Sequence, residues 1–149
     1  MVIIVGSGAG GAIIASELAK SGIEVTIIEK GPYIHSKDAF NYYDAYNDDV
    51  DLLTTTCIGG ATIVSMSNMV RALDEELHDY GIDISKEYEY VEELIGVHQL
   101  DESHIGEGTR RFLDAGEKLG LKTLKMPKAI REKDCIQCGK CAFGCPADA

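Results

Sequence analysis

The sequence has little positive charge and no run of lysine or arginine residues. Its 149 residues include 14 lysines and arginines against 25 aspartates and glutamates, which gives a formal net charge of −11. A protein that binds nucleic acid needs a basic patch to neutralise phosphate groups. The charge pattern therefore argues against a nucleic-acid partner, and the acidity itself indicates little more than good solubility.

Long apolar runs and a leader segment are also missing. A membrane-spanning helix needs about 20 consecutive apolar residues, and no apolar run in the sequence comes near that length. The chain opens directly on an apolar stretch at residues 2–5, with no basic region or cleavage site ahead of it. We therefore expect no membrane span, no secretory signal and, by default, a cytoplasmic location.

Recognisable signatures of side-chain catalysis are absent from the sequence. No G-x-S-x-G stretch marks a nucleophilic serine. The histidines do not have the spacing of metal ligands or of a catalytic triad, so we expect surface or ordinary hydrogen-bonded residues. They are His35, His78, His98 and His104. We therefore assign no catalytic residue to this chain.

A glycine-rich turn near the start of the sequence is the first feature that indicates a function. The apolar run at residues 2–5 predicts a buried strand, and residues 12–19 predict a helix with a wide apolar face. Residues 6–11, Gly-Ser-Gly-Ala-Gly-Gly, join the two. Strand, glycine turn and helix form the context of a dinucleotide-binding fingerprint.

Three glycines of this turn have an expected role in the fingerprint. Gly6 would make the tight bend, Gly8 would let the backbone approach a pyrophosphate, and Gly11 would allow close packing of helix on strand. The backbone N–H groups at the start of the helix would then face the phosphates. The turn residues that we expect to contact the cofactor are Gly6, Gly8, Ala9, Gly10 and Gly11.

A carboxylate stands where the ribose of a dinucleotide would need an acceptor. Gly22 ends the helix, since glycine is common just past the last helical turn. Residues 24–28 predict a second buried strand, and Glu29 follows it directly, 18 residues after Gly11. A carboxylate at about this spacing accepts hydrogen bonds from ribose hydroxyls. The alternative is a strand–helix–strand turn without a ligand, in which Glu29 is an ordinary surface residue.

A second glycine pair lies further along the chain, in Gly59-Gly60-Ala61-Thr62. Paired glycines beside a small hydroxyl residue let the backbone come close to a flat or charged group. The alternative is a plain turn, followed by a buried segment of core over residues 63–70.

The other predicted elements are mostly helical. Residues 33–50 carry aromatic and acidic residues without a clean period, which predicts an irregular loop or a short helix. Apolar positions recur at helical spacing over residues 86–96 and 103–119, and Gly120 ends the second of these helices. Residues 122–126 predict one further short strand.

Four of the five cysteines lie close together near the end of the sequence. They are Cys135, Cys138, Cys141 and Cys145, and they are followed by a proline as in a bacterial ferredoxin run. Short gaps of this kind let thiolates converge on an iron–sulfur cubane, whereas a structural zinc site usually takes two separated Cys-x-x-Cys pairs. The run predicts a [4Fe–4S] cluster, with zinc and an unoccupied motif as alternatives. Cys145, Cys57 or a cysteine beyond residue 149 would be the fourth ligand.

The two motifs together make the chain similar to a known family. It resembles the glucose–methanol–choline family of FAD-dependent oxidoreductases, in the microbial branch with a ferredoxin-like cysteine motif. The resemblance rests on the glycine turn, Glu29, the second glycine pair and the segment over residues 106–111. It implies that FAD is held at its pyrophosphate and ribose by the turn and Glu29, and at its flavin end by the second glycine pair. The implied cofactor-binding residues are Gly6, Gly8, Ala9, Gly10, Gly11, Glu29, Lys30, Gly59, Gly60 and Thr62.

The resemblance also implies a reaction and a fold. The reaction is oxidation of a CH–OH group of a small-molecule alcohol, with hydride passing to FAD and electrons leaving through the cluster to an acceptor protein. The family's catalytic histidine lies near the C-terminus of a much longer chain, so we expect this chain alone to be inactive and its missing C-terminal part to be a partner.

We expect an α/β fold in three parts. Residues 1–72 would form a doubly wound, Rossmann-like FAD-binding core, residues 73–130 a helical extension and residues 131–149 a cysteine-rich segment. Two other functions remain open. One is an NAD-dependent dehydrogenase domain, which would need only the first fingerprint, and the other is an electron-transfer flavoprotein or binding module without its own substrate.

Overall fold

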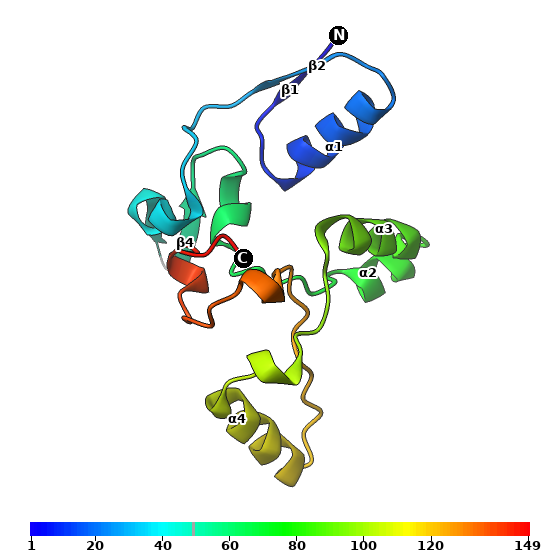
Figure 1. Cartoon of the computed structure of the whole chain (residues 1–149). Coiled ribbons are helices and arrows are strands. Elements are labelled where there is room, and N and C mark those ends of the chain that lie inside the picture. The colour runs from blue at the N-terminus through cyan, green and yellow to red at the C-terminus, as the bar shows by residue number, and fades with distance from the viewer. Residues whose placement is uncertain (49) are drawn as a thin grey trace. The chain divides into compact units, whose positions relative to one another are not determined.

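The computed structural model describes residues 1–48 and 50–149. They form two compact units, whose elements can be followed along the chain in Figure 1. Unit 1 consists of Met1–Met66 with Cys138–Asp148, and unit 2 consists of Ser67–Gln137 with Ala149. The division expected from the sequence, after residues 72 and 130, stays a prediction. Over the described part of the chain, no helix combines the length and the apolar character needed to cross a membrane.

Unit 1 begins with a strand–helix–strand arrangement, formed by β1 (Val2–Val5), α1 (Ala9–Lys20) and β2 (Val25–Ile28). The two strands are parallel, with Val2 opposite Val25 and Val5 opposite Ile28. Parallel strands need a crossover connection, and α1, which contacts both strands, provides it (Figure 1). The predicted order of strand, glycine turn, helix and strand is confirmed.

The predicted burial of these strands is wrong within the described residues. Val5 is 83% exposed, Ile3 55% and Ile28 54%. Strands of a parallel sheet are ordinarily covered on both faces, which is why their sequences are continuously apolar. The apolar pattern therefore identified the strands correctly, but the described residues do not supply the cover that the pattern anticipates.

The segment after β2 is more regular than its sequence predicts. A 3₁₀ helix, η1 (Ser36–Tyr42), is followed by an antiparallel hairpin of β3 (Tyr43–Asp48) and β4 (Val50–Thr55). The predicted short helix is confirmed, while the predicted loop is wrong where the two strands pair. Cross-strand pairing depends on a neighbouring segment, so it leaves little trace in the local pattern. Residue 49, also within the predicted loop, lies outside the described residues.

The core of unit 1 is small and lies around Cys57. Ile34, Ala39 and Cys57 are buried together, and Ile63 and Val64 pack against them from the 3₁₀ helix η2 (Gly60–Val64). The core segment predicted at residues 63–70 is thus confirmed only at its start. Beyond it, Val70 is 58% exposed.

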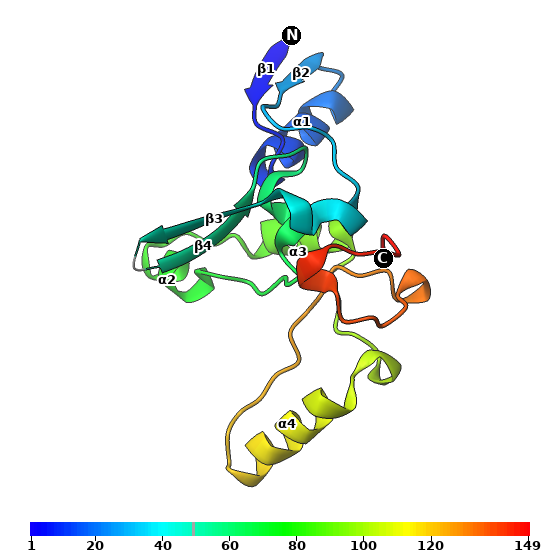
Figure 2. The same ribbon diagram turned by 90° about the vertical axis from the view of Figure 1, so that its left-hand side faces the viewer.

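The C-terminal part of unit 1 packs against η1. The 3₁₀ helix η5 (Cys141–Phe143) contacts η1, as the red and cyan helices of Figure 2 show. The Ser36 hydroxyl lies within hydrogen-bond reach of two acceptors, the Cys145 carbonyl oxygen at 3.0 Å and the Asp148 carboxylate. Gly144 has φ +99°, and a Cβ there would lie 1.9 Å from the Ser36 carbonyl oxygen. Only glycine therefore permits this close approach.

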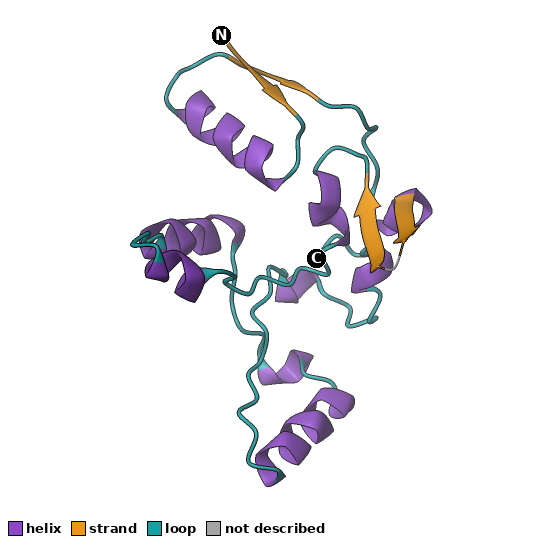
Figure 3. Cartoon of the chain, turned by 180° about the vertical axis from the view of Figure 1, so that it is seen from behind, coloured by secondary structure: helices purple, strands orange, loops and turns teal. Residues whose placement is uncertain are grey.

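Unit 2 consists of helices and connecting segments, and all the strands, orange in Figure 3, belong to unit 1 within the described part of the chain. Its elements are α2 (Asp74–Asp79), α3 (Ser85–Ile95), η3 (Glu102–His104), α4 (Glu107–Lys118) and η4 (Glu132–Asp134). Helix α3 confirms the prediction for residues 86–96, whereas α2 was not expected. Arg71 pairs with Glu92 of α3 at 2.7 Å, and its guanidinium lies over the Tyr88 ring.

Two predictions in unit 2 need correction. The helix expected over residues 103–119 is interrupted, because Gly106, in an extended conformation, caps α4 and separates it from η3. The strand expected over residues 122–126 is irregular. Pairing in this region occurs instead at Lys128, which forms isolated antiparallel bridges with Asn68 and His98. These contacts hold the two ends of unit 2 together.

Candidate nucleotide-binding site

The glycine turn lies between the end of β1 and the start of α1. Gly6 has φ +88°, and its carbonyl oxygen would lie 2.1 Å from a Cβ at position 11. Gly11 is therefore the position where helix and strand approach too closely for any side chain, as the fingerprint predicts. Gly8 is the N-cap residue of α1, and no side chain caps the first helical turn. An uncapped helix start of this kind suits an anion.

Glu29, at the end of β2, binds back to the glycine turn. Its Oε2 accepts hydrogen bonds from the Ser7 N–H at 2.8 Å and the Ser7 hydroxyl at 2.7 Å, and its Oε1 accepts from the Gly31 N–H at 2.8 Å. The bond from Gly31, followed by those from Ser7, lowers the pKa of Glu29 from 4.5 to about 2. These hydrogen bonds thus favour the ionised carboxylate, which is the stronger acceptor for hydroxyl groups such as those of a ribose.

The second glycine pair lies against the glycine turn. The Gly59 N–H donates to the Ser7 hydroxyl oxygen at 3.0 Å, and a Cβ at position 60 would lie 3.2 Å from the Gly8 Cα atom. Gly59 and Gly60 both have positive φ, at +92° and +57°. Thr62 donates its hydroxyl hydrogen to the Gly59 carbonyl oxygen at 2.6 Å. The structure thus brings together the glycine turn, Glu29 and the second glycine pair.

The remaining predicted contact residues are open to solvent. Ala9 and Gly10 are exposed in the first turn of α1, and Lys30 is exposed directly after Glu29. Ser7 is the site residue that the sequence did not single out, because it occupies a variable position of the fingerprint. A hydroxyl residue between two glycines was the only signal. Its partners, Glu29 and Gly59, are 22 and 52 residues away in sequence.

The four clustered cysteines fall on both sides of the division between the units. Cys135 belongs to unit 2, and Cys138, Cys141 and Cys145 belong to unit 1. Cys138 and Cys141 are exposed, and Cys145 is half-buried. Across residues 1–48 and 50–149, no three cysteine, histidine or acidic side chains gather into a group that could hold a metal ion. The described residues therefore add no support for the predicted iron–sulfur cluster, which stays a prediction.

Cys57, one of the candidates for the fourth cluster ligand, lies in the core of unit 1. It is 1% exposed in the core of unit 1. Its sulfur lies 3.8 Å from the Thr55 hydroxyl oxygen and 3.8 Å from the Gly60 carbonyl oxygen. Its position supports the turn that carries the second glycine pair.

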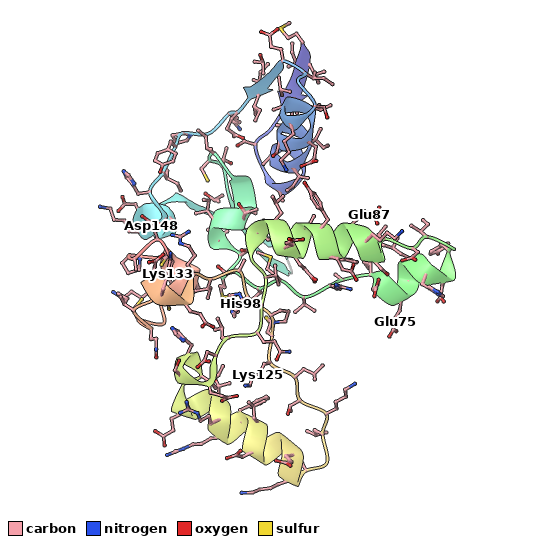
Figure 4. All side chains as sticks on the ribbon, turned by 45° about the vertical axis from the view of Figure 1, so that its right-hand side comes forward. Glu75, Glu87, His98, Lys125, Lys133 and Asp148 are labelled. Carbon is pink, nitrogen blue, oxygen red and sulfur yellow. The ribbon has the colours of Figure 1, made fainter. Side chains whose placement is uncertain are left out.

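Two of the four histidines are held by Glu132 in unit 2. His98 Nε2 lies 3.4 Å from Glu132 Oε1, and His104 Nε2 lies 3.2 Å from the Glu132 carbonyl oxygen. His98 Nδ1 also lies 2.8 Å from the Gly96 carbonyl oxygen. Figure 4 marks His98 in the segment that follows α3. Both side chains are thus within hydrogen-bond distance of backbone carbonyl groups of unit 2.

The strand–turn–helix–strand arrangement, with a carboxylate bound back to the turn, is that of a Rossmann-like fold. The model of the NAD(P)-binding Rossmann-like domain family matches residues 4–50. The crystal structure of pyridoxine 4-oxidase from Mesorbium loti has the same fold over 88% of this chain and 36% of that chain, with a TM-score of 0.66 and 16% identity. The predicted Rossmann-like fold class is confirmed.

The sequence relatives name the family. Long-chain-alcohol oxidase FAO1 from Arabidopsis thaliana is 30% identical over 170 residues, covering 97% of this chain and 22% of the oxidase. A GMC-type oxidoreductase from Mycobacterium tuberculosis is 25% identical over 173 residues, covering 99% of this chain and 27% of that protein. The homologues of this chain are thus GMC-type oxidoreductases, and the predicted family resemblance is confirmed. The chain spans about a quarter of the length of these two relatives.

Proposed function

We propose that this chain is the FAD-binding part of an oxidoreductase that acts on CH–OH groups. The observation that carries the proposal is the joining of the two glycine motifs and Glu29 at Ser7. The ribose hydroxyls of the adenosine would donate to Glu29, and the pyrophosphate would lie at the start of α1. The GMC-type homologues support FAD as the dinucleotide.

FAD, when bound, supplies the acceptor for the hydride. The residues of this chain bind and orient it: Glu29 and the neighbouring Lys30 at the adenosine end, and Gly59, Gly60 and Thr62 toward the flavin end. A small-molecule alcohol is the proposed substrate class, supported by the long-chain-alcohol oxidases among the relatives. No residue of this chain is proposed as the catalytic base. The base and the substrate pocket would come from the C-terminal part of the same enzyme.

The proposed cluster, electron acceptor, division into parts and location rest on the sequence alone. A [4Fe–4S] cluster on Cys135, Cys138, Cys141 and Cys145, with an acceptor protein for its electrons, is supported by the ferredoxin-like spacing alone. We therefore route no step of the reaction through it. The division into a core over residues 1–72, a helical extension and a cysteine-rich segment, and the cytoplasmic location, belong to the proposal in the same way.

A nicotinamide nucleotide is the second candidate ligand. It is favoured by the match to the model of the NAD(P)-binding Rossmann-like domain family over residues 4–50. That match covers the first fingerprint and Glu29, which FAD and NAD domains share. The second glycine pair, at Gly59 and Gly60, is the feature that an NAD domain would not need.

Direct binding measurements separate the candidates. The purified chain is titrated with FAD, FMN, NAD and ADP, and any cofactor released on denaturation is identified by chromatography. We expect binding of FAD and ADP but not of FMN, which lacks the adenosine. We also expect Glu29→Gln to weaken FAD binding about tenfold or more, because the ribose loses a charged acceptor. The control is Glu24→Gln, which changes an exposed glutamate before β2 and should leave FAD binding unchanged. Recovery of a nicotinamide nucleotide alone would replace the proposal with an NAD domain.

A further inference from the structure

Ser7 is the one buried polar side chain of the glycine turn, at 7% exposure, and its hydroxyl is hydrogen-bonded to two other segments of unit 1, at Glu29 and at Gly59. We propose that Ser7 is a positioning residue of the nucleotide site, whose hydroxyl fixes Glu29 and the Gly59-Gly60 turn relative to the fingerprint. The inference rests on the proposed FAD site and adds to it the residue that aligns its two ends.

The hydroxyl of Ser7 is used in both directions. It donates to Glu29 Oε2 at 2.7 Å, and it accepts from the Gly59 N–H at 3.0 Å. A serine hydroxyl has one hydrogen to donate and lone pairs to accept, so a single atom can serve both partners. Alanine at position 7 would remove a donor from Glu29 and the acceptor from Gly59 in one step.

The neighbouring contacts show why these two partners need alignment. Gly59 reaches Ser7 because the segment after β4 runs beside residues 31–32, where the Ile58 N–H donates to the Pro32 carbonyl oxygen at 3.0 Å. The Gly31 N–H in turn binds Glu29 at 2.8 Å. The end of β2, the second glycine pair and the fingerprint therefore meet in one hydrogen-bonded ring, which the Ser7 hydroxyl closes.

Ser7 acts on the cofactor through its partners rather than by contact. Hydrogen bonds to an ionised acceptor are stronger than those between neutral groups, so the Ser7–Glu29 bond favours one orientation of the carboxylate. The lowered pKa of Glu29 has the hydrogen bond from the Ser7 hydroxyl as its second largest cause, after that from the Gly31 N–H. A change in that pKa is thus a direct readout of the role of Ser7.

The first measurement needs no nucleotide. The Glu29 carboxyl carbon is titrated by NMR in the labelled chain, with far-UV circular dichroism confirming that the fold persists at each pH. We expect Ser7→Ala to raise the pKa of Glu29 from about 2 toward its usual value. Ser7→Thr, which keeps the hydroxyl, should restore the low pKa. Ser21→Ala, which removes a hydroxyl bonded to the Glu17 carbonyl oxygen of α1, is the matched control.

The second measurement is FAD affinity at neutral pH. We expect about a tenfold loss in Ser7→Ala, rescue in Ser7→Thr and no change in Ser21→Ala, since the removed hydroxyl serves a charged group and a backbone donor. Where Ser7→Ala does not fold, Ser7→Cys replaces the hydroxyl with a thiol, which is only a weak donor and acceptor, while a side chain of similar size is kept.

The outcomes separate this inference from the proposed function. An unchanged Glu29 pKa in the folded hydroxyl-free variant overturns the positioning role, whatever the affinity. Equal loss of affinity in Ser7→Thr and Ser7→Ala also overturns it, because the hydroxyl would then not be the cause. A wild-type chain that binds neither FAD nor ADP overturns the proposed function, while the Glu29 titration still decides the role of Ser7.

Discussion

The glycine motifs and the cysteine run have comparably strong sequence signals, yet the structure treats them differently. Both glycine motifs and Glu29 lie within unit 1 and contact one another through Ser7. The cysteine run crosses from unit 2 into unit 1, and no metal-binding group forms among the described residues. The glycine turn and Glu29 directly follow two neighbouring parallel strands, so the pairing of those strands brings these two parts of the motif together. A motif of side chains on a loop depends on the loop conformation, which spacing does not fix.

We expect the largest effect from a substitution in the glycine turn. Gly11→Val places a side chain where a Cβ would already lie 2.1 Å from the Gly6 carbonyl oxygen. We expect the free energy of unfolding to fall by about 3 kcal/mol, as for overpacking of a closed site, and FAD binding to be lost. Chemical denaturation followed by circular dichroism measures the stability.

Gly10→Ala is the matched control for this substitution. Gly10 lies in the same helical turn, with nothing within 4 Å of its would-be Cβ. Alanine should there be neutral or stabilising, by up to about 1 kcal/mol, because glycine is a poor helix former. Equal losses in the two variants would contradict the close approach of Gly11 and Gly6.

We expect a smaller effect from a substitution in the segment that carries the clustered cysteines. Gly144→Ala puts a Cβ 1.9 Å from the Ser36 carbonyl oxygen, which would separate η5 from η1. Gly139→Ala has similar backbone strain, at φ +70°, but nothing within 4 Å. We expect faster hydrogen exchange of residues 141–148 in Gly144→Ala than in Gly139→Ala. Indistinguishable exchange would mean that backbone strain alone, without the steric contact, governs this segment.

The cysteines should differ in the rate at which a thiol reagent labels them. Cys57 is buried, while Cys138 and Cys141 are exposed. A thiol reagent should therefore label Cys138 and Cys141 quickly and Cys57 only on unfolding, since access limits the reaction. Mass spectrometry of the labelled peptides reads the order.

Anaerobic reconstitution tests whether the clustered cysteines can take up iron. The ferredoxin-like spacing predicts about four irons per chain with acid-labile sulfide. Protection of the four clustered cysteines from the thiol reagent should accompany the iron. Loss of the metal to a chelator should then restore their labelling. Reconstituted protein without iron, or with zinc alone, would remove the iron–sulfur prediction.

The sequence predicts the fold best where local pattern and local structure coincide. The strands and helix of residues 2–28 and helix α3 follow from apolar runs and helical periods. The β3–β4 hairpin was missed because its strands pair with each other, and such pairing cannot be predicted from the local residue pattern of either strand. The strand expected at residues 122–126 has no partner strand among the described residues.

The candidate site divides in the same way. The glycines and Glu29 could be found because the fingerprint fixes their spacing along one strand–helix–strand unit. Ser7 could not, because its role depends on hydrogen bonds to Glu29 and Gly59, and the fingerprint leaves its position variable. The exposure of Val5 was also beyond the sequence, since an apolar strand implies cover without saying which residues provide it.

The smallest expected effect concerns the pH dependence of stability. The pKa of Glu29 is lowered in the folded state to about 2, chiefly by the Gly31 N–H and then by Ser7, from 4.5 in the unfolded chain. A carboxylate with a lowered folded-state pKa stabilises the fold fully above its unfolded pKa, and that contribution is lost as the pH falls through the folded-state value. The stability difference between wild type and Glu29→Gln should therefore be constant above about pH 5 and shrink between about pH 4.5 and pH 2. Urea denaturation at a series of pH values measures this difference, with Glu24→Gln as the control. A difference that persists unchanged down to pH 2 would show that Glu29 supports the glycine turn by its shape and not by its charge.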